Sequence, residues 1–464
     1  MANFDSCSRP FLFILAGALT VPLLVVGREK NKKSEIVSEK VIAKVATHSR
    51  FTPFEQRWFP ESVAISPDGK QVAYVEHWDG WRVVVNQNVG PLYDGITKGH
   101  FNFSEDGKHF GYTGWKGDRQ ANVIDGKEGK FYSKVGAPLF SRDGMHAGYM
   151  ANEGTNYFWV LDDVPHALEA EPVPNGIFGP DADGITYAQV IDGSEQVVER
   201  GKKHKIYDFI ERDTLVMTRD GNRIGYIAAR GGKRLPQQKL GPPLYSMYAR
   251  LHDKAKRFVV VDGREGPEYE FAYGLTFSPD GKRYSYAGFR GDEVFVITDG
   301  VEGPRHHYEY NRPTTGIRQP PVFSPDSKRM AYALGKKEHQ HFVIIDGKEE
   351  GPYRGIADWT LTFSPDSKRL GYIAQIGQKY MLVVDGVASE KGVPQGLYLT
   401  RPVFNENGEH VVFSSTFLFI NGKIEIGEGF ILGGIRFVGP AQFQCLEIRK
   451  DNQIRVVERS ILTD

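Results

Sequence analysis

A short phrase of the form S-P-D-G-K recurs along the chain, and its recurrence constrains the fold more than any other feature. It is written "TFSPDSKRLGYIA" at 362–374, "TFSPDGKRYSYAG" at 276–288 and "AISPDGKQVAYVE" at 64–76. The copies align on Ser66, Ser104, Ser141, Gly179, Thr218, Ser278, Ser324, Ser364 and Asn405. Most intervals are close to forty residues, and a period of that length made of short apolar runs indicates stacked β-sheets.

Each phrase predicts a β-hairpin. Proline suits the second position of a type I turn, aspartate the third, and glycine the positive φ that follows. Short apolar strands flank the turn on both sides. Ser327 and Ser367 replace the glycine, so we expect slight backbone strain in those two turns.

An aromatic residue follows each anchor by eight positions, and the residue before it is usually small. The aromatic positions are Tyr74, Tyr112, Tyr149, Tyr187, Tyr226, Tyr286, Tyr332, Tyr372 and Phe413. Neighbouring strand residues point to opposite faces of a sheet. The pattern therefore predicts like sheets stacked face to face, with this aromatic column in the core.

A third apolar run follows each hairpin and usually ends in Asp-Gly or Asn-Gly, as in "FVVVDGREGP" (258–267). Such dipeptides favour a tight turn into a fourth strand. Four-stranded sheets repeated around an axis form a β-propeller. The expected fold is all-β, a propeller of about nine to ten four-stranded repeat units.

Closure of the propeller leaves two arrangements open. A degraded tenth unit runs from Ile435 to the end and lacks a fourth strand, which "FTPFEQRW" (51–58) is placed to supply. One continuous ring is favoured because no linker interrupts the pattern. Two smaller propellers joined near residue 272 are the alternative.

The hairpins resemble those of the TolB-like, WD-repeat-like propeller family, whose mark is F-S-P-D-G-[KR]-x-[IL]-x-[FY]. "FSPDSKRLGYIA" and "FSPDGKRYSYAG" carry the resemblance, which covers most of the chain. The resemblance implies the propeller fold and indicates almost nothing about function. Similar hairpins occur in propellers attached to prolyl-oligopeptidase-type hydrolases, but no G-x-S-x-G nucleophile turn is present here.

The N-terminal region predicts a link to a membrane. Residues 11–27, "FLFILAGALTVPLLVVG", carry no charge, and segment 1–33 fits either a signal peptide or an uncleaved anchor. Residues 34–50 are expected to form a charged, partly helical tether, and 51–464 the propeller. A membrane-anchored or exported protein is expected, with the periplasmic or extracellular side favoured. The basic residues that follow the run favour the opposite, cytoplasm-facing orientation.

Composition narrows the classes of function. Lys+Arg and Asp+Glu both total 58, so charge gives no reason to expect nucleic acid as a partner. Two cysteines provide neither a disulfide framework nor a cysteine-based zinc site. The aspartates of the repeats are explained by turn formation. The sequence predicts no catalytic residue, no metal ligand and no cofactor.

Binding residues are expected where the units differ. The loops between the second and third strands vary, and exposed aromatic and charged residues there are typical of binding hot spots. The fifth unit swells into a basic insertion at 229–257, with few acids. The predicted binding residues are Trp78, Trp81, Trp115, Lys116, Arg119, Phe289, Arg290 and Asp292, and, in the insertion, Arg234, Tyr245, Tyr248 and Arg250.

These observations favour a non-enzymatic propeller at or beyond a membrane. Its partner would be a protein, peptide or glycan, bound on the variable loop face. The alternative is a hydrolase or lyase with its active site at the central channel, which would require a unique acidic or histidine cluster around the axis.

Overall fold

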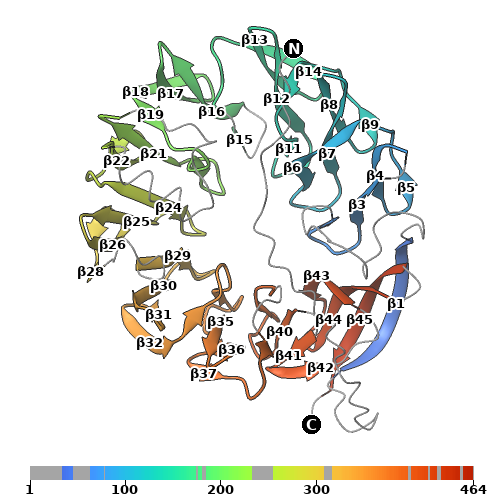
Figure 1. Ribbon diagram of the computed structural model, residues 1–464, viewed down its shortest axis with the longest axis vertical. Helices are drawn as coiled ribbons and strands as arrows, with labels where there is room; N and C mark the ends of the chain where they lie inside the picture. Colours follow the sequence, from blue (N-terminus) through green and yellow to red (C-terminus); the bar gives the residue numbers. More distant parts are fainter. Residues whose placement is uncertain are drawn as a thin grey trace, which may run out of the picture.

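The chain forms one ring of β-sheets around a central axis (Figure 1). The computed structural model describes residues 34–44, 63–77, 79–173, 176–179, 184–232, 254–307, 316–394, 399–415, 418–425, 430–449 and 453–462. Within these ranges the strands make ten antiparallel sheets and no helix. The propeller prediction is confirmed with ten blades in a single ring, and the alternative of two smaller propellers is wrong.

Each blade runs from an inner strand a to an outer strand d (Figure 1). The strands of blades 1 to 3 are β2 (Val63–Ile65), β3 (Val72–His77), β4 (Trp81–Val85), β5 (Asn88–Val89); β6 (Gly95–Phe103), β7 (Phe110–Lys116), β8 (Arg119–Ile124), β9 (Lys127–Glu128); β10 (Lys134–Val135), β11 (Leu139–Phe140), β12 (Ala147–Glu153), β13 (Asn156–Leu161) and β14 (Val164–Leu168).

Blades 4 to 6 continue the ring, with inner or outer strands split in two at several places. Their strands are β15 (Ile177–Phe178), β16 (Ile185–Ile191), β17 (Ser194–Glu199), β18 (Lys202–Tyr207); β19 (Phe209–Ile210), β20 (Val216–Met217), β21 (Ile224–Arg230), β22 (Lys256–Val261), β23 (Arg264–Glu265); β24 (Phe271–Phe277), β25 (Tyr284–Arg290), β26 (Glu293–Thr298), β27 (Val301–Glu302) and β28 (His306–His307).

Blades 7 to 10 complete the circle. Their strands are β29 (Gly316–Phe323), β30 (Met330–Lys337), β31 (Gln340–Ile345), β32 (Lys348–Tyr353); β33 (Gly355–Ile356), β34 (Thr362–Phe363), β35 (Leu370–Ile376), β36 (Lys379–Val384), β37 (Val387–Ala388), β38 (Val393–Pro394); β39 (Val403–Phe404), β40 (Val411–Ser414), β41 (Leu418–Ile420), β42 (Lys423–Glu425); β43 (Phe430–Phe437), β44 (Gln442–Ile448), β45 (Gln453–Ile461) and β1 (Ser34–Lys44).

An N-terminal strand closes the ring. β1 pairs antiparallel with β45, from Ser34 opposite Ile461 to Lys44 opposite Gln453, and supplies strand d of blade 10. A closing strand from near the N-terminus was expected, but the expected segment was different. Residues 34–44 are part of the propeller and not of a tether, while 51–58 lie outside the described residues.

Charged contacts fasten the closing strand. An Arg449 guanidinium nitrogen lies 2.7 Å from a Glu39 carboxylate oxygen. Arg459, which is 2% exposed, pairs with Glu447 at 2.5 Å and contacts the Ser34 hydroxyl at 3.4 Å. The Arg449–Glu39 pair therefore adds to the strand ladder of β1, while the buried Arg459–Glu447 pair, which joins β45 to β44, would typically cost ~3–5 kcal/mol to break.

The recurring serine shapes each a–b turn. In blade 1 the Ser66 hydroxyl donates to Asp68 Oδ1 at 2.6 Å and accepts from the Gln71 amide at 2.9 Å. Ser327 and Ser367 adopt the positive φ expected at their position, 65° in both. Their hydroxyls accept hydrogen bonds from the Asp280 and Asp326 amides of the preceding blades. The strain expected from sequence is therefore offset by a contact between blades.

The aromatic column lies in the core, as expected. All nine of its residues are buried, from Tyr226 and Tyr372 at 0% to Tyr187 at 7% exposed. Three of the tyrosines, Tyr112, Tyr149 and Tyr286, place their hydroxyls against a glycine of the preceding blade, as Tyr112 does at Gly90. The small residue beside the tyrosine faces the next blade, where Phe404 would collide with any side chain at Gly371. Repeated residues thus pack blade against blade.

Candidate binding surface on blades 1 and 2

Only part of the predicted binding set falls on described residues. Trp78 and the four insertion residues, Arg234, Tyr245, Tyr248 and Arg250, lie outside them. The structure also narrows the insertion, because β21 continues to Arg230 and β22 begins at Lys256. Arg257, at the predicted end of the insertion, is fully buried and pairs with Glu211 at 2.7 Å.

Trp81 and Trp115 flank one connecting segment between blades 1 and 2. Trp81 exchanges two backbone hydrogen bonds with Tyr93, at 2.9 and 2.8 Å. Trp115 accepts a backbone hydrogen bond from Asp94 at 2.9 Å and is paired with Gly95 in the register of β6 and β7. The two tryptophans are thus held on opposite sides of residues 92–95, at the end of the blades where the b–c loops lie.

Apolar side chains are exposed along this segment. Leu92 is 42% and Trp115 36% exposed, while Trp81 is half-buried and its ring centroid lies 4.4 Å from that of His77. A Cβ built at Gly95 would lie 2.3 Å from the Trp115 ring, so the missing side chain makes room for the indole. We call Trp81, Leu92 and Trp115 the tryptophan rim.

Lys116 lies beside the tryptophan rim but belongs to a joint between blades. Its ammonium group lies 4.8 Å from the centre of the Tyr93 ring and 3.2 Å from Glu128, which also accepts a hydrogen bond from the Tyr93 hydroxyl at 2.5 Å. Cation–π contacts and charge-assisted hydrogen bonds reinforce each other in this arrangement.

The same joint recurs with other residues. In blade 6, Arg290 pairs with Glu302 at 2.7 Å and lies 5.1 Å from the Tyr269 ring, whose hydroxyl donates to Glu302 at 2.8 Å. Arg230 pairs in the same way with Glu265 at 2.6 Å. Lys116 and Arg290 were expected to be binding cations, and the structure places both in this repeated joint.

Electrostatics follow from these contacts. Burial, together with the hydrogen bond to Glu128, raises the pKa of the Tyr93 phenol, so this hydroxyl stays protonated and donates. Burial opposes ionisation of Glu265, but hydrogen bonds from Arg230 and other donors lower its pKa to about 2. The hydrogen bond from Arg290 likewise lowers the pKa of Glu302. The carboxylates of Glu265 and Glu302 are therefore ionised at neutral pH.

The remaining predicted residues differ in exposure. Arg119 bridges blades 2 and 3 through Glu153 at 2.8 Å and the Phe131 carbonyl at 2.6 Å. Asp292 is exposed at a b–c loop tip and lies 3.3 Å from His307. Phe289, which was expected among the exposed aromatics, is only 1% exposed and packs in the core between blades 6 and 7. Its ring is not part of the surface because Phe271 and its neighbours cover it.

Sequence reasoning overlooked Trp359. It is 70% exposed and has a φ of 63°, a conformation that bulky residues rarely adopt. It follows strand β33 of blade 8, and Asp213 occupies the matching position in blade 5 with a φ of 60°. The signal was present, since "DWTL" and "RDTL" align five residues before their anchors and only one carries an aromatic ring.

Two further searches covered the described part of the chain. No helix there is long and apolar enough to cross a membrane. No group of three or more histidine, cysteine, aspartate or glutamate side chains there is arranged to hold a metal ion. The apolar run at 11–27 lies outside the residues searched.

Comparison with known proteins was made at three levels. No family model matches the chain, and no curated protein matches it. Among solved structures, a eukaryotic initiation factor is 11% identical, with a TM-score of 0.43, over 78% of this chain and 94% of that one.

Two other solved structures are named as propellers. The β-propeller domain of the Trilobed protease from Pyrococcus furiosus is 13% identical, with a TM-score of 0.29, over 63% of this chain and 94% of that one. The propeller domain of Myceliophteria thermophila Cps50 (Swd1) is 14% identical, with a TM-score of 0.26, over 63% and 98%. At such scores the likeness carries no functional argument, and the propeller assignment rests on the strand pairing described above.

Proposed function

We propose that this chain is a non-enzymatic binding propeller of the TolB-like type that recognises a protein or peptide through the tryptophan rim. The fold is compatible with binding, since propellers present loops of many blades on one face. The partner chemistry that fits is an apolar side chain, because the rim offers Leu92 and Trp115 to solvent beside polar loops. Exposed aromatic residues of this kind often anchor protein interfaces.

The observation that carries the proposal is a difference between equivalent positions. Trp115 and Phe289 occupy the same place in blades 2 and 6, each three residues after the aromatic column. Phe289 is 1% exposed, whereas Trp115 is 36% exposed. Packing between blades therefore does not require an exposed ring at this position. The exposure of the Trp115 ring on blade 2 supports a role in binding.

A capture experiment tests the proposal. The chain carrying Trp81→Ser and Trp115→Ser is compared with wild type and with Met145→Ser in pull-downs from the cell that produces it. Met145 is a matched control because it is 74% exposed and follows an a–b turn at the opposite end of blade 3. We expect a protein partner to be lost only with the tryptophan variants. A partner retained by them, or a glycan captured in its place, would contradict the proposal.

We also propose that residues 11–27 hold the propeller at a membrane or direct its export. The support is the charge-free apolar run itself, which fits a signal peptide or an anchor. Fractionation combined with protease accessibility in intact cells checks this. Recovery of the full-length chain in the soluble cytoplasmic fraction would refute it.

A further inference from the structure

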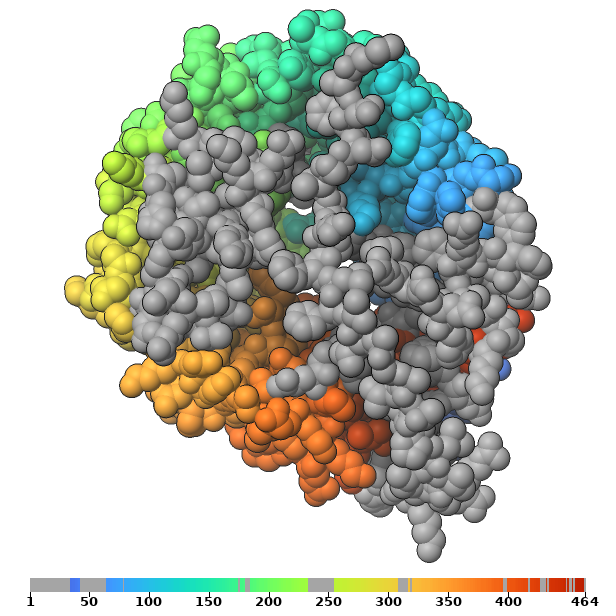
Figure 2. Space-filling view, in the orientation of Figure 1, coloured from blue at the N-terminus to red at the C-terminus, as the bar shows by residue number. Residues whose placement is uncertain are grey.

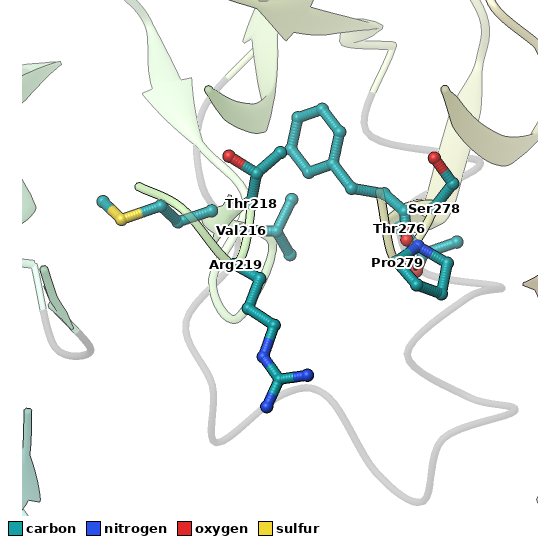
Figure 3. Close-up of a pocket in the computed structure, with 8 residues that line it drawn as sticks. Val216, Thr218, Arg219, Thr276, Ser278 and Pro279 are labelled. Carbon is teal, nitrogen blue, oxygen red and sulfur yellow. Dashed lines mark hydrogen bonds between the residues drawn. The ribbon is translucent and has the colours of Figure 1, made fainter. Parts of the chain in front are cut away.

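A small pocket opens between the inner strands of blades 5 and 6, at the end of the ring where the a–b turns lie. It has a volume of about 250 Å³ and is lined from one side by Val216–Arg219 and from the other by Thr276–Pro279 (Figure 3). This end is opposite to the tryptophan rim. Figure 2 shows the described blades following one another around the centre of the molecule, from blue through green and yellow to orange.

The wall of the pocket is apolar and well supported. Its apolar lining residues are Val216, Met217, Phe277 and Pro279. Phe277 packs on Gly225, where an added Cβ would lie 3.5 Å from its ring, and the Arg223 guanidinium lies 5.2 Å from the ring centre. The same arginine donates to the Gly281 carbonyl at 2.8 Å, which ties the two blades together. Contacts between the two blades therefore hold this wall of the pocket in place.

The hydroxyl groups at the pocket already have fixed partners. Thr218 Oγ1 donates to Asp220 at 2.6 Å, and Ser278 Oγ donates to Asp280 at 2.7 Å. Both interactions belong to the repeated turn. Arg219 stands where the blade 6 turn has Pro279, and it extends its guanidinium beyond the apolar wall (Figure 3).

Arg219 has a weak and shared ion-pair partner. Its guanidinium lies 3.4 Å from Glu105 of blade 2 and is 74% exposed. Glu105 has a closer partner, since Arg142 of blade 3 donates to it at 2.9 Å. Arg142 also donates to the Arg219 backbone carbonyl. Two arginines therefore share one carboxylate where the turns of blades 2, 3 and 5 meet, and the Arg219 guanidinium stays largely exposed beside the pocket.

We propose that this pocket binds the C-terminal residue of a peptide or protein, with an aliphatic side chain in the cavity and the free carboxylate on Arg219. The volume is below the roughly 300–1,000 Å³ of pockets for drug-sized ligands and suits a single side chain. A carboxylate is the complement of the exposed guanidinium, which pairs with it through two nitrogens. The ligand carboxylate takes the place that Glu105 occupies in the free protein.

Binding of a defined probe to the full chain tests this site. The probe is the peptide acetyl-Gly-Gly-Ser-Leu, offered with a free C-terminus and as the C-terminal amide, with calorimetry as the readout. We expect the free acid to bind at least about tenfold more tightly than the amide, because one charge-assisted pairing is lost. Equal binding of the two forms, or no binding at millimolar peptide, would overturn the proposal.

Single substitutions distinguish the contribution of the Arg219 charge to peptide binding from that of the cavity. Arg219→Gln is expected to weaken the free acid at least about tenfold and to leave the amide unchanged. Met217→Trp fills the cavity and is expected to abolish binding of both. Glu105→Gln removes the competing carboxylate and is expected to preserve or strengthen binding. The assignment would be contradicted if Arg219→Gln bound the free acid as tightly as wild type does, or if Glu105→Gln bound it more weakly.

A second arm distinguishes the source of the carboxylate. Octanoate carries the same charge on an aliphatic chain without a peptide backbone. Binding of octanoate with no binding of the peptide would mean that the site takes free aliphatic acids, and the proposed occupant would be wrong. The tryptophan variants leave this pocket intact, so failure of the rim proposal and failure of this one are separable.

Discussion

Blades 1 and 2 meet through the same set of contacts as blades 5 and 6. The two edges nevertheless present different surfaces to solvent. Both have a backbone bridge, Trp81 with Tyr93 and Arg257 with Tyr269. Both have a tyrosine, a glutamate and a cation in a joint.

The residues around this shared frame differ between the two edges. Where blade 6 has Phe271, blade 2 has Gly95, and the facing ring changes from buried Phe289 to exposed Trp115. The bridge position itself changes from fully buried Arg257 to half-buried Trp81.

The two edges show how one repeated unit can present different surfaces in different blades. The joint residues cannot change freely, because they hold neighbouring blades together. Positions beside the joint can exchange bulk, and loss of the side chain at Gly95 makes room for a ring that remains accessible to solvent. The exposed aromatic surface of blade 2 therefore arises from substitutions next to the residues that recur at both edges.

The largest effect is expected from truncating the rings at the equivalent positions Phe289 and Trp115. Phe289→Ala should destabilise the fold by ~3–5 kcal/mol, as for other fully buried aromatics. Trp115→Ala should cost less, ~1–2 kcal/mol, because part of its ring stays in water. Thermal and urea unfolding of both variants measure this. Equal losses would show that Trp115 is a core residue and would break the comparison.

A side chain introduced at Gly95 tests the comparison between Gly95 and Phe271 more sharply. Gly95→Ala places a Cβ against the Trp115 ring, so the indole must move, at a cost of ~1–3 kcal/mol. We expect a shift in tryptophan fluorescence and weaker partner capture. Gly136→Ala is the control, since the nearest atom to its added Cβ is 3.6 Å away. Unchanged fluorescence in Gly95→Ala would contradict the packing described for the rim.

The joints should be sensitive to acid. The pKa of Glu265 is lowered from 4.5 to about 2, so its contribution to stability is complete above pH 4.5 and is lost as the pH falls toward 2. The difference in Tm between wild type and Glu265→Gln should therefore shrink across that window. A difference that stays constant down to pH 2 would show that the ionised carboxylate contributes nothing.

A smaller effect with the opposite sign is expected at the a–b turns of blades 2 and 3. There His109 and His146 take the position of the arginines that bridge to the next blade, such as Arg369, which donates to the Gly408 carbonyl at 2.9 Å. The hydrogen bond to Asp162, at 2.6 Å, raises the pKa of His146 above 6.5.

Because the folded pKa of His146 is raised, its contribution to stability is complete below pH 6.5 and is lost as the pH rises through the folded pKa. The Tm difference between wild type and His146→Gln should therefore be larger at pH 5.5 than at pH 8. A larger difference at pH 8 would reverse the assigned sign. The effect should be small, because the pair is partly exposed and screened by solvent.

Most of the fold could be predicted from sequence because nine copies of the repeat carry the same local signals. Turn residues, strand alternation and the aromatic column each act within one blade or between neighbours. The closing strand was missed because β1 is an outer strand with mostly exposed side chains, so it lacks a strong apolar pattern. Its partner β45 is also distant in the chain.

The site was predicted less completely, for reasons of packing. Lys116 and Arg290 each follow the column tyrosine by four residues, and their partners Glu128 and Glu302 follow the Asp-Gly aspartate by three. That recurrence indicates a structural joint and was available in the sequence. The burial of Phe289 was not, because it depends on Phe271, whose position opposite it is set by the pairing of β24 and β25.

The most direct test of the central claim, that the exceptions to the repeat form the binding surface, is site-specific photo-crosslinking in the native cell. A photoreactive residue is placed at Leu92 in the tryptophan rim and, separately, at Met145 near the opposite end of the ring. We expect a discrete crosslinked protein from position 92 and none from position 145. Crosslinks only from position 145, or from neither, would contradict the account.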